Sequence, residues 1–431
     1  MSDQGESAID NVNSDTSEKP AKAPSKGSLL VLFLTVFIDL LGFGMVMPLL
    51  AVYADQFSMD ADGWTIGLLM ASFSFMQFIF APIWGMISDR VGRRPILILG
   101  LAGSAVFYGL FAWASFANSL TWLFISRIGA GICGATIPTT QAYIADSTPP
   151  DKRSHGMALI GMAMGFGFTF GPLLGFLALP EGEGNPGPWP GIVASALSAI
   201  ALLMAIFMLP ESKPPGIQST ARKWLDVAGL KHALSRKSIL ILLLGYSVCI
   251  FAFVQFETTL SLLLWRSEHG IEQTPFDFSW RNMLLTFAFV GFVLAIVQGG
   301  IIRPLTKRLN DIMLLQIGLI LEVVGFLLLM YAIRLPSVSW MFAGLTVISS
   351  GFAFIQPSLH ALVSKWTSSD QQGSVLGFAQ SLNAMARILG SAIGIPLLKK
   401  SITLPYSMGA VLMLVTAVII GLASRFNGQG K

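Results

Sequence analysis

The chain has 431 residues, of which 54% are hydrophobic and only 12% are charged. Soluble domains carry about 25% charged residues, so this composition excludes an ordinary soluble protein and indicates a protein that crosses a lipid bilayer many times. The formal net charge of +4 does not call for a nucleic-acid partner, because the basic residues follow the order of the apolar segments.

The chain begins with a polar tail and continues as a series of apolar segments. Residues 1–27 are rich in Ser, Asp, Glu, Lys and Pro, which predicts a disordered tail and not a signal peptide. A transmembrane helix needs about 20 apolar residues. Segments of that length predict an all-α integral membrane protein with twelve transmembrane helices: 28–53, 64–88, 95–116, 120–145, 156–178, 190–210, 238–264, 282–303, 312–333, 338–363, 372–397 and 404–424.

The basic residues predict which side of the membrane each loop faces. An even number of spans places both termini on one side, and 20 of the 27 Lys and Arg residues lie on that side, against five on the other. Because cytoplasmic loops carry the excess of basic residues, both termini are expected in the cytoplasm, including a short tail at 425–431.

One polar segment divides the spans into two sets of six. Residues 211–237 contain six Lys or Arg residues and a Pro-Pro pair, which predicts a cytoplasmic linker. The linker separates an N-terminal six-helix bundle at 28–210 from a C-terminal six-helix bundle at 238–424.

A compact charged loop joins the second and third spans. It contains one acid, three arginines and two glycines in the spacing Gly-(x)3-Asp-(x)2-Gly-Arg-Arg. These residues are Gly85, Asp89, Arg90, Gly92, Arg93 and Arg94. A loop that only set the membrane orientation would need the arginines but not this spacing. We expect Gly92 to permit the turn and Gly85 to let another backbone approach. Gly300 and Arg308 stand 215 residues after Gly85 and Arg93, which indicates a degenerate internal repeat.

Five charged side chains fall inside the predicted spans, where each costs at least about 2.5–3.5 kcal/mol. They are Asp39, Arg127, Glu257, Glu322 and Arg387. One interpretation is two structural ion pairs with one acid left over. The other is a pathway for protons and substrate, because burial favours the neutral form of a carboxyl group and a nearby arginine favours the charged form.

Amide side chains also occur within the spans. Gln77, Gln255 and Asn383 would suit the cavity of an uncharged or weakly charged ligand, and hydrogen bonds between helices are an equal alternative for each. We expect His360 to be structural. The sequence shows no metal-ligand cluster, no nucleophile with a base and no phosphate loop, so it predicts neither an enzyme nor a bound cofactor or metal.

Several of these stretches resemble one family of membrane transporters. The charged loop closely matches the loop between helices 2 and 3 of the major facilitator superfamily. The stretch from Asp39 to Pro48 resembles the first helix of its twelve-helix drug:proton antiporters, and the stretch from Arg127 to Thr136 resembles their fourth helix. The motif of their fifth helix is matched by Gly167, Gly171, Pro172 and Gly175. Taken together, the chain looks most like bacterial tetracycline efflux pumps.

The resemblance implies two six-helix repeats around a central cavity and favours the bacterial inner membrane. No clear oligomeric signal occurs in the sequence, so a monomer is the default expectation. The resemblance also implies an ion pair between Arg93 and Asp146, and places Asp89 near residues 372–373 at the start of helix 11; these contacts would close the cytoplasmic side in the outward-facing state. In the family, the helix-5 glycines contact the other half of the molecule. A purely structural interface of small residues is the alternative.

The expected function is export of a drug-like or small organic metabolite in exchange for protons, by alternating access. Asp39, Glu257 and Glu322 are the candidate proton carriers, tuned by Arg127 or Arg387. Tetracycline itself does not follow as the substrate, because Phe107 and Leu294 replace an acid and a histidine of the tetracycline pumps. A facilitator or symporter of a small organic solute is the alternative, and a membrane enzyme or signalling protein is a remote one.

Overall fold

The computed structural model describes residues 26–57, 62–148, 153–178, 187–212, 237–265, 275–306, 308–367 and 372–427. Among these residues, regular structure is helical apart from one isolated bridge between Trp265 and Phe278. Twelve helical segments are long and apolar enough to cross a membrane, so the predicted all-α membrane fold is confirmed. The polar amino-terminal tail, most of the predicted linker and the last residues of the chain lie outside the described residues.

The helices follow one another in two sets. The first set is α1 (Lys26–Phe57), α2 (Trp64–Val91), α3 (Arg93–Phe116), α4 (Leu120–Cys133), α5 (Ile137–Ser147), α6 (Arg153–Ala178) and α7 (Trp189–Met208). The second set is α9 (Lys237–Leu264), α10 (Trp280–Ile296), the π-helix η2 (Val297–Ile302), α11 (Arg303–Leu305), α12 (Asp311–Arg334), α13 (Val338–Trp366), α14 (Gln372–Lys400) and α15 (Leu404–Asn427).

The fourth span, predicted as one helix over 120–145, is interrupted between α4 and α5. Pro138 lies at the start of α5, and a proline has no N–H and clashes with the carbonyl four residues earlier, here that of Gly134. Gln77 of α2 donates to this Gly134 carbonyl at 3.2 Å, and the Trp84 indole donates to the Ile132 carbonyl at 2.7 Å. Gln77 therefore stabilises the break, which is the interhelical alternative considered for it.

The eighth span, predicted as one helix over 282–303, is also irregular. It runs from α10 through η2 into the single turn of α11, which contains Pro304. Loss of the proline N–H and the clash of its ring account for the wider turn before it.

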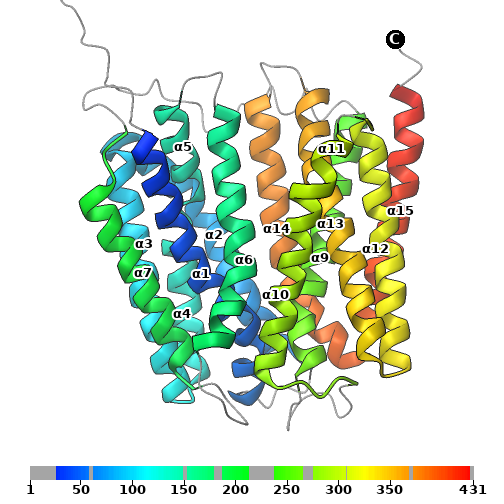
Figure 1. Ribbon diagram of the computed structural model, residues 1–431, viewed down its shortest axis with the longest axis horizontal. Coiled ribbons are helices and arrows are strands. Elements are labelled where there is room, and N and C mark those ends of the chain that lie inside the picture. Colours follow the sequence, from blue (N-terminus) through cyan, green and yellow to red (C-terminus); the bar gives the residue numbers. More distant parts are fainter. Residues whose placement is uncertain are drawn as a thin grey trace, which may run out of the picture.

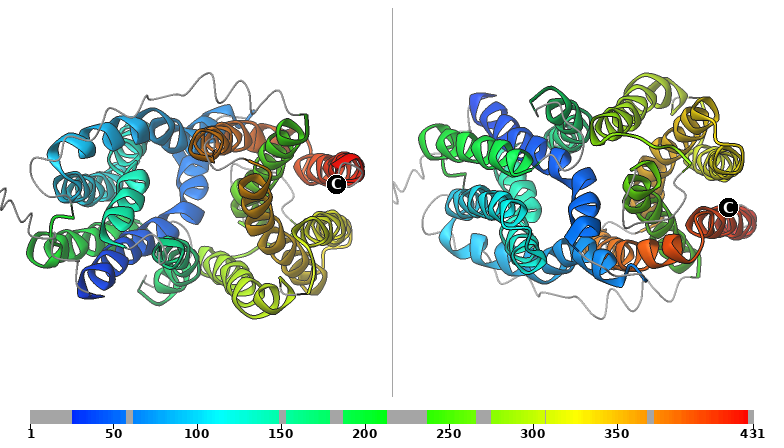
Figure 2. Two further views of the ribbon diagram at one scale, coloured as in Figure 1. Left: turned by 90° about the horizontal axis from the view of Figure 1, so that it is seen from above. Right: turned by 90° about the horizontal axis from the view of Figure 1, so that it is seen from below.

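The two sets form two bundles that lie side by side (Figure 1). Seen from above and from below, α1 to α7 lie on one side of the molecule and α9 to α15 lie on the other (Figure 2). The bundles contact each other chiefly through α2 with α14 and through α6 with α10. The start of α1 and the end of α15 lie at the same end of the molecule, which we call the terminal face; the opposite end is the distal face.

The two bundles are closed against each other toward the distal face. A Cβ atom added at Gly67 of α2 would lie 2.4 Å from the Ala392 carbonyl oxygen of α14. One added at Gly291 of α10 would lie 2.7 Å from the Thr169 hydroxyl of α6. The helix backbones therefore approach each other directly at both contacts.

Toward the terminal face, glycines on the same helix faces have no close neighbour among the described residues. Gly161 and Gly165 precede Thr169 by eight and four residues on α6, and Gly85 follows Gly67 by five helical turns on α2, so each shares a face with a closed contact. A Cβ atom at any of these three glycines would meet no atom within 4 Å. The prediction that another backbone approaches Gly85 is thus wrong for this conformation, because the bundles are apart at that end.

Within the first bundle, α6 packs on α1 through glycines. A Cβ atom at Gly44 would lie 2.4 Å from the Gly167 carbonyl oxygen, and one at Gly171 would lie 2.7 Å from the Leu41 carbonyl oxygen. The predicted close packing of the helix-5 glycines is present. The expectation that it lies against the other half is wrong for Gly167 and Gly171, because their face of α6 is turned to α1.

Gly175 differs from the other two glycines, because it reaches both bundles. A Cβ atom there would lie 2.9 Å from the Met45 side chain of α1 and 3.1 Å from the Leu284 side chain of α10. Pro172 lies inside α6 on the turn before Gly175. Of the three motif glycines, Gly175, near the distal end of α6, is therefore the one that lies between the two bundles.

Replacing Gly44 by alanine is expected to destabilise the first bundle by about 1–3 kcal/mol, because the new methyl group overlaps the α6 backbone. Thermal unfolding of the purified protein in detergent measures this loss. Gly161→Ala is the matched control, since its methyl group enters open space and alanine favours helix. Equal unfolding temperatures for the two variants would contradict this packing.

Candidate functional site

The charged loop at the terminal face is organised around Arg93. Gly92, with φ at 104°, ends α2 and begins α3, which confirms the predicted turn. Arg93 is buried and forms ion pairs with Asp89 at 2.6 Å and with Asp146 at 3.0 Å. The predicted pair between Arg93 and Asp146 is therefore present. It ties the loop to the end of α5.

Glu211, which is not among the predicted residues of the cytoplasmic gate, also binds this loop. Its two carboxylate oxygens accept the backbone N–H groups of Arg93 at 2.9 Å and Arg94 at 3.1 Å. Free N–H groups and a partial positive charge make the start of a helix favourable for a carboxylate. Because 118 residues separate Glu211 from Arg93, no local pattern reveals the contact.

The outer arginines of the loop have different surroundings. The Arg94 guanidinium donates to the Ile206 carbonyl at 2.5 Å, near the end of α7. Arg90 is exposed. The expected contact of Asp89 with the start of α14 involves side chains outside the described part of the structure, and it stays a prediction for the closed state of the terminal face.

Replacing Glu211 by alanine is expected to lower the free energy of unfolding by about 1 kcal/mol, because two N–H groups at the start of α3 lose their acceptor. Thermal unfolding in detergent checks this value. Glu211→Gln, which keeps one side-chain acceptor, is expected to fall between wild type and Glu211→Ala. A wild-type unfolding temperature for the alanine variant would show that the contact contributes nothing.

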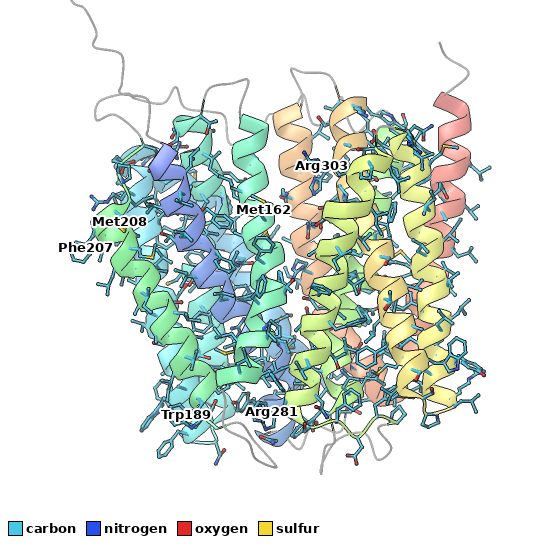
Figure 3. All side chains as sticks on the ribbon, in the orientation of Figure 1. Met162, Trp189, Phe207, Met208, Arg281 and Arg303 are labelled. Carbon is cyan, nitrogen blue, oxygen red and sulfur yellow. The ribbon has the colours of Figure 1, made fainter. Side chains whose placement is uncertain are left out.

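A buried ion pair connects the two bundles at the distal face. Lys399 of α14 lies 3.1 Å from Asp55 of α1, and their side chains are only 9% and 3% exposed. Arg281 of α10 lies toward the same face (Figure 3), where it contacts α6 by donating to the Phe176 carbonyl at 3.3 Å and stacking on the Phe176 ring. Figure 3 also shows Arg303 toward the opposite, terminal face.

The Asp55–Lys399 pair is not predictable from the apolar segments, because both residues lie just beyond the predicted spans. α1 extends to Phe57 and α14 extends to Lys400, which brings the two side chains inside helices. An acid and a lysine placed two residues beyond apolar segments in opposite halves carry no pairing signal of their own.

Two of the predicted intramembrane charges lie inside the first bundle. Asp39 accepts hydrogen bonds from Ser198 of α7 at 2.7 Å and from Ser104 of α3 at 3.5 Å. Arg127 of α4 is buried, and its guanidinium carbon lies 4.6 Å from the centre of the Phe73 ring. Neither residue has an ion pair among the described residues, so the structure does not join them to each other.

The other three lie in the second bundle. Arg387 of α14 and Glu257 of α9 form an ion pair with 3.7 Å between Nη2 and Oε2. Glu322 of α12 is fully buried, and neither carboxyl oxygen has a hydrogen-bond partner among the described residues. A Cβ atom at Gly351 of α13 would lie 2.7 Å from the Glu322 side chain, so the acid is enclosed between helices.

The predicted amides of the second bundle have unlike surroundings. Asn383 donates to the Tyr246 hydroxyl at 2.8 Å, and that hydroxyl lies 3.2 Å from His360 Nε2. Asn383 and His360 thus belong to one network between α9, α13 and α14. Gln255 is fully buried, and both polar atoms of its side chain lack a partner within the described chain.

Comparison with known proteins identifies this arrangement. The family model described as Major Facilitator Superfamily matches residues 32–313, more than half of the chain. The protein belongs to the major facilitator superfamily. A class C tetracycline resistance protein of Escherichia coli is 29% identical, with the alignment covering 94% of this chain and 92% of that relative. Major facilitator superfamily domain-containing protein 10 of Mus musculus is 30% identical over 87% of this chain and 88% of the relative.

A solved structure shares the fold as well. The crystal structure of the human organic anion transporter MFSD10 (TETRAN) superposes with a TM-score of 0.68 at 28% identity, covering 93% of this chain and all of that one. The resemblance to tetracycline efflux pumps predicted from the motifs is confirmed by these relatives. A multi-pass membrane transporter, and not an enzyme, is what the family and the fold establish.

Proposed function

We propose that this transporter exports a small organic molecule in exchange for protons, by alternating access. The observation that carries the proposal is the unequal contact between the bundles, which are closed at the distal face and apart toward the terminal face. A carrier that alternates between two such arrangements exposes its interior to one side at a time.

The excess of basic residues on the side of the termini supports a cytoplasmic terminal face. The conformation described above is then open to the cytoplasm and closed to the outside. The bilayer would be the bacterial inner membrane and the functional unit a monomer. The pair of Arg93 with Asp146 would hold the charged loop ready to close the cytoplasmic side.

Three acids are candidates for the proton carrier, and their surroundings differ. Glu322 has the strongest case, because an ionised carboxylate that lacks any hydrogen bond is costly in an apolar interior. Glu257 comes second, since Arg387 lies beside it. Asp39 would act from within the first bundle, where two serine hydroxyls stabilise it, with Arg127 on the neighbouring α4.

The names of the relatives bear on the substrate. Tetracycline resistance proteins and an organic anion transporter both match nearly the whole chain. By the resemblance, Phe107 and Leu294 take the places of an acid and a histidine of the tetracycline pumps. A small organic molecule other than tetracycline is therefore the proposed cargo.

Expression in a bacterial host that lacks its own efflux pumps tests the proposal. Growth against a panel of toxic organic compounds is expected to improve for at least one compound, and an agent that collapses the proton gradient is expected to remove that benefit. Uptake or efflux that continues unchanged without the proton gradient would instead identify a facilitator.

A further inference from the structure

The ion pair between Arg387 and Glu257 is loose. The Nη2 to Oε2 distance is 3.7 Å, whereas a charge-assisted hydrogen bond between such groups measures about 2.7–2.9 Å. Glu257 Oε2 has no hydrogen-bond partner among the described residues, although it is buried. An arginine presents five N–H donors in a planar fork, and the part of the chain that the structure describes supplies Arg387 with no hydrogen bond.

Arg387 is also accessible. Its side chain is 32% exposed, whereas Arg127, the other intramembrane arginine, is 2% exposed. Met385 and Leu389 share the face of α14 that packs on α2 through Ala392, and Arg387 points away from that face. Arg387 and Asn383, one turn apart, instead contact side chains of α9, so Arg387 lies on the face of α14 turned toward the second bundle.

Its height along the helix places Arg387 beside the closed contact. Ala392, little more than one turn farther toward the distal face, packs on Gly67 of α2. Toward the terminal face, α2 meets open space at Gly85. Along the helix axis, Arg387 thus lies on the terminal side of the closed contact.

We propose that Arg387 binds the carboxylate of an organic anion, which displaces Glu257 from the guanidinium. This deepens the proposed function and rests on it, because it names the substrate class as carboxylate-bearing organic molecules. A free carboxylate can approach the guanidinium fork with both oxygens, which is the geometry that arginine matches best. Glu257 is held in place by α9, and one of its oxygens lies 3.7 Å from the guanidinium of Arg387. It is therefore a weak competitor of the substrate carboxylate for Arg387.

Equilibrium binding to the purified full chain tests this assignment. The probes are naphthalene-1-carboxylate and naphthalene-1-carboxamide, which have the same shape and differ in charge, and the method is isothermal titration calorimetry without a pH gradient. The carboxylate is expected to bind and the amide to bind at least about tenfold more weakly, since hydrogen bonds to a charged group are lost.

Variants of the pair are expected to change the affinity in opposite directions. Arg387→Gln is expected to weaken carboxylate binding about ten- to a hundredfold, and Arg387→Lys to weaken it less, because the charge remains without the fork. Glu257→Gln is expected to strengthen binding, because the competing carboxylate is gone. Arg334→Gln removes one exposed arginine at the distal end of α12 and is expected to leave the affinity unchanged.

Four results would each overturn the assignment: absence of carboxylate binding, equal binding of the acid and the amide, unchanged binding in Arg387→Gln, and weakened binding in Glu257→Gln. The last would show that the two residues act only as a structural pair. Because the measurement needs no gradient, failure of proton coupling would leave its result intact. Proton-coupled export of an uncharged compound only would preserve the proposed function and contradict this inference.

Discussion

Replacing Asp55 by asparagine is expected to open the distal face. The substitution leaves the Lys399 ammonium buried without its carboxylate, and removing one partner of a buried ion pair costs about 3–5 kcal/mol. The loss falls on the conformation that contains the pair, so the equilibrium is expected to shift away from it by more than a hundredfold. Distances between spin labels at Ala117 and Leu335, which are exposed at the distal ends of α3 and α12, measure the two populations.

Two controls separate the ion pair from a general loss of charge. The double variant Asp55→Asn with Lys399→Gln removes both charges and is expected to close the distal face better than either single variant. Lys365→Gln removes an exposed lysine that pairs with Asp311 inside the second bundle and is expected to change nothing. An unchanged distance distribution in Asp55→Asn would show that the pair does not hold the distal face closed.

Replacing Glu322 by glutamine is expected to abolish proton-coupled transport while the protein still folds. The carboxyl group is fully buried and neither of its oxygens has a hydrogen-bond partner among the described residues, so this conformation accommodates the neutral acid. Glutamine resembles that neutral form and cannot release a proton. Counterflow of labelled substrate without a pH gradient is expected to persist, and accumulation against the substrate gradient is expected to cease.

Glu322→Asp provides the comparison for this variant, because it keeps an acid at the same position with a shorter side chain. Partial coupling in the aspartate variant and none in the glutamine variant would support titration of this site. Full coupling in Glu322→Gln would remove Glu322 from the proton pathway and leave Glu257 and Asp39 as candidates.

The fold followed from the sequence because membrane spans depend on local composition. Apolar segments, the charged loop and the basic bias are each visible within a few dozen residues, and the positive φ of Gly92 was expected from its place in the loop. The breaks at Pro138 and Pro304 were missed, although the prolines were visible, because whether a proline bends or interrupts a membrane helix depends on which neighbours satisfy the freed carbonyl groups.

The candidate site could be predicted from the sequence only in part. The charged residues inside the spans are recognisable from the sequence as energetically costly. Which of them form pairs depends on contacts between helices that are far apart in the sequence. The 344 residues between Asp55 and Lys399 carry no signal for their pairing. The same holds for the orientation of Asp39 toward α3 and α7, since a single helix with apolar residues on all sides does not indicate which face is turned inward.

The most direct test of proton-coupled export is proton movement driven by substrate. Purified protein is placed in liposomes that contain a pH-sensitive dye, and an outward gradient of a transported compound is imposed with no initial pH difference. Protons are expected to move opposite to the compound in the wild type and not in Glu322→Gln. Movement of the compound with no change of internal pH in the wild type would contradict proton-coupled export.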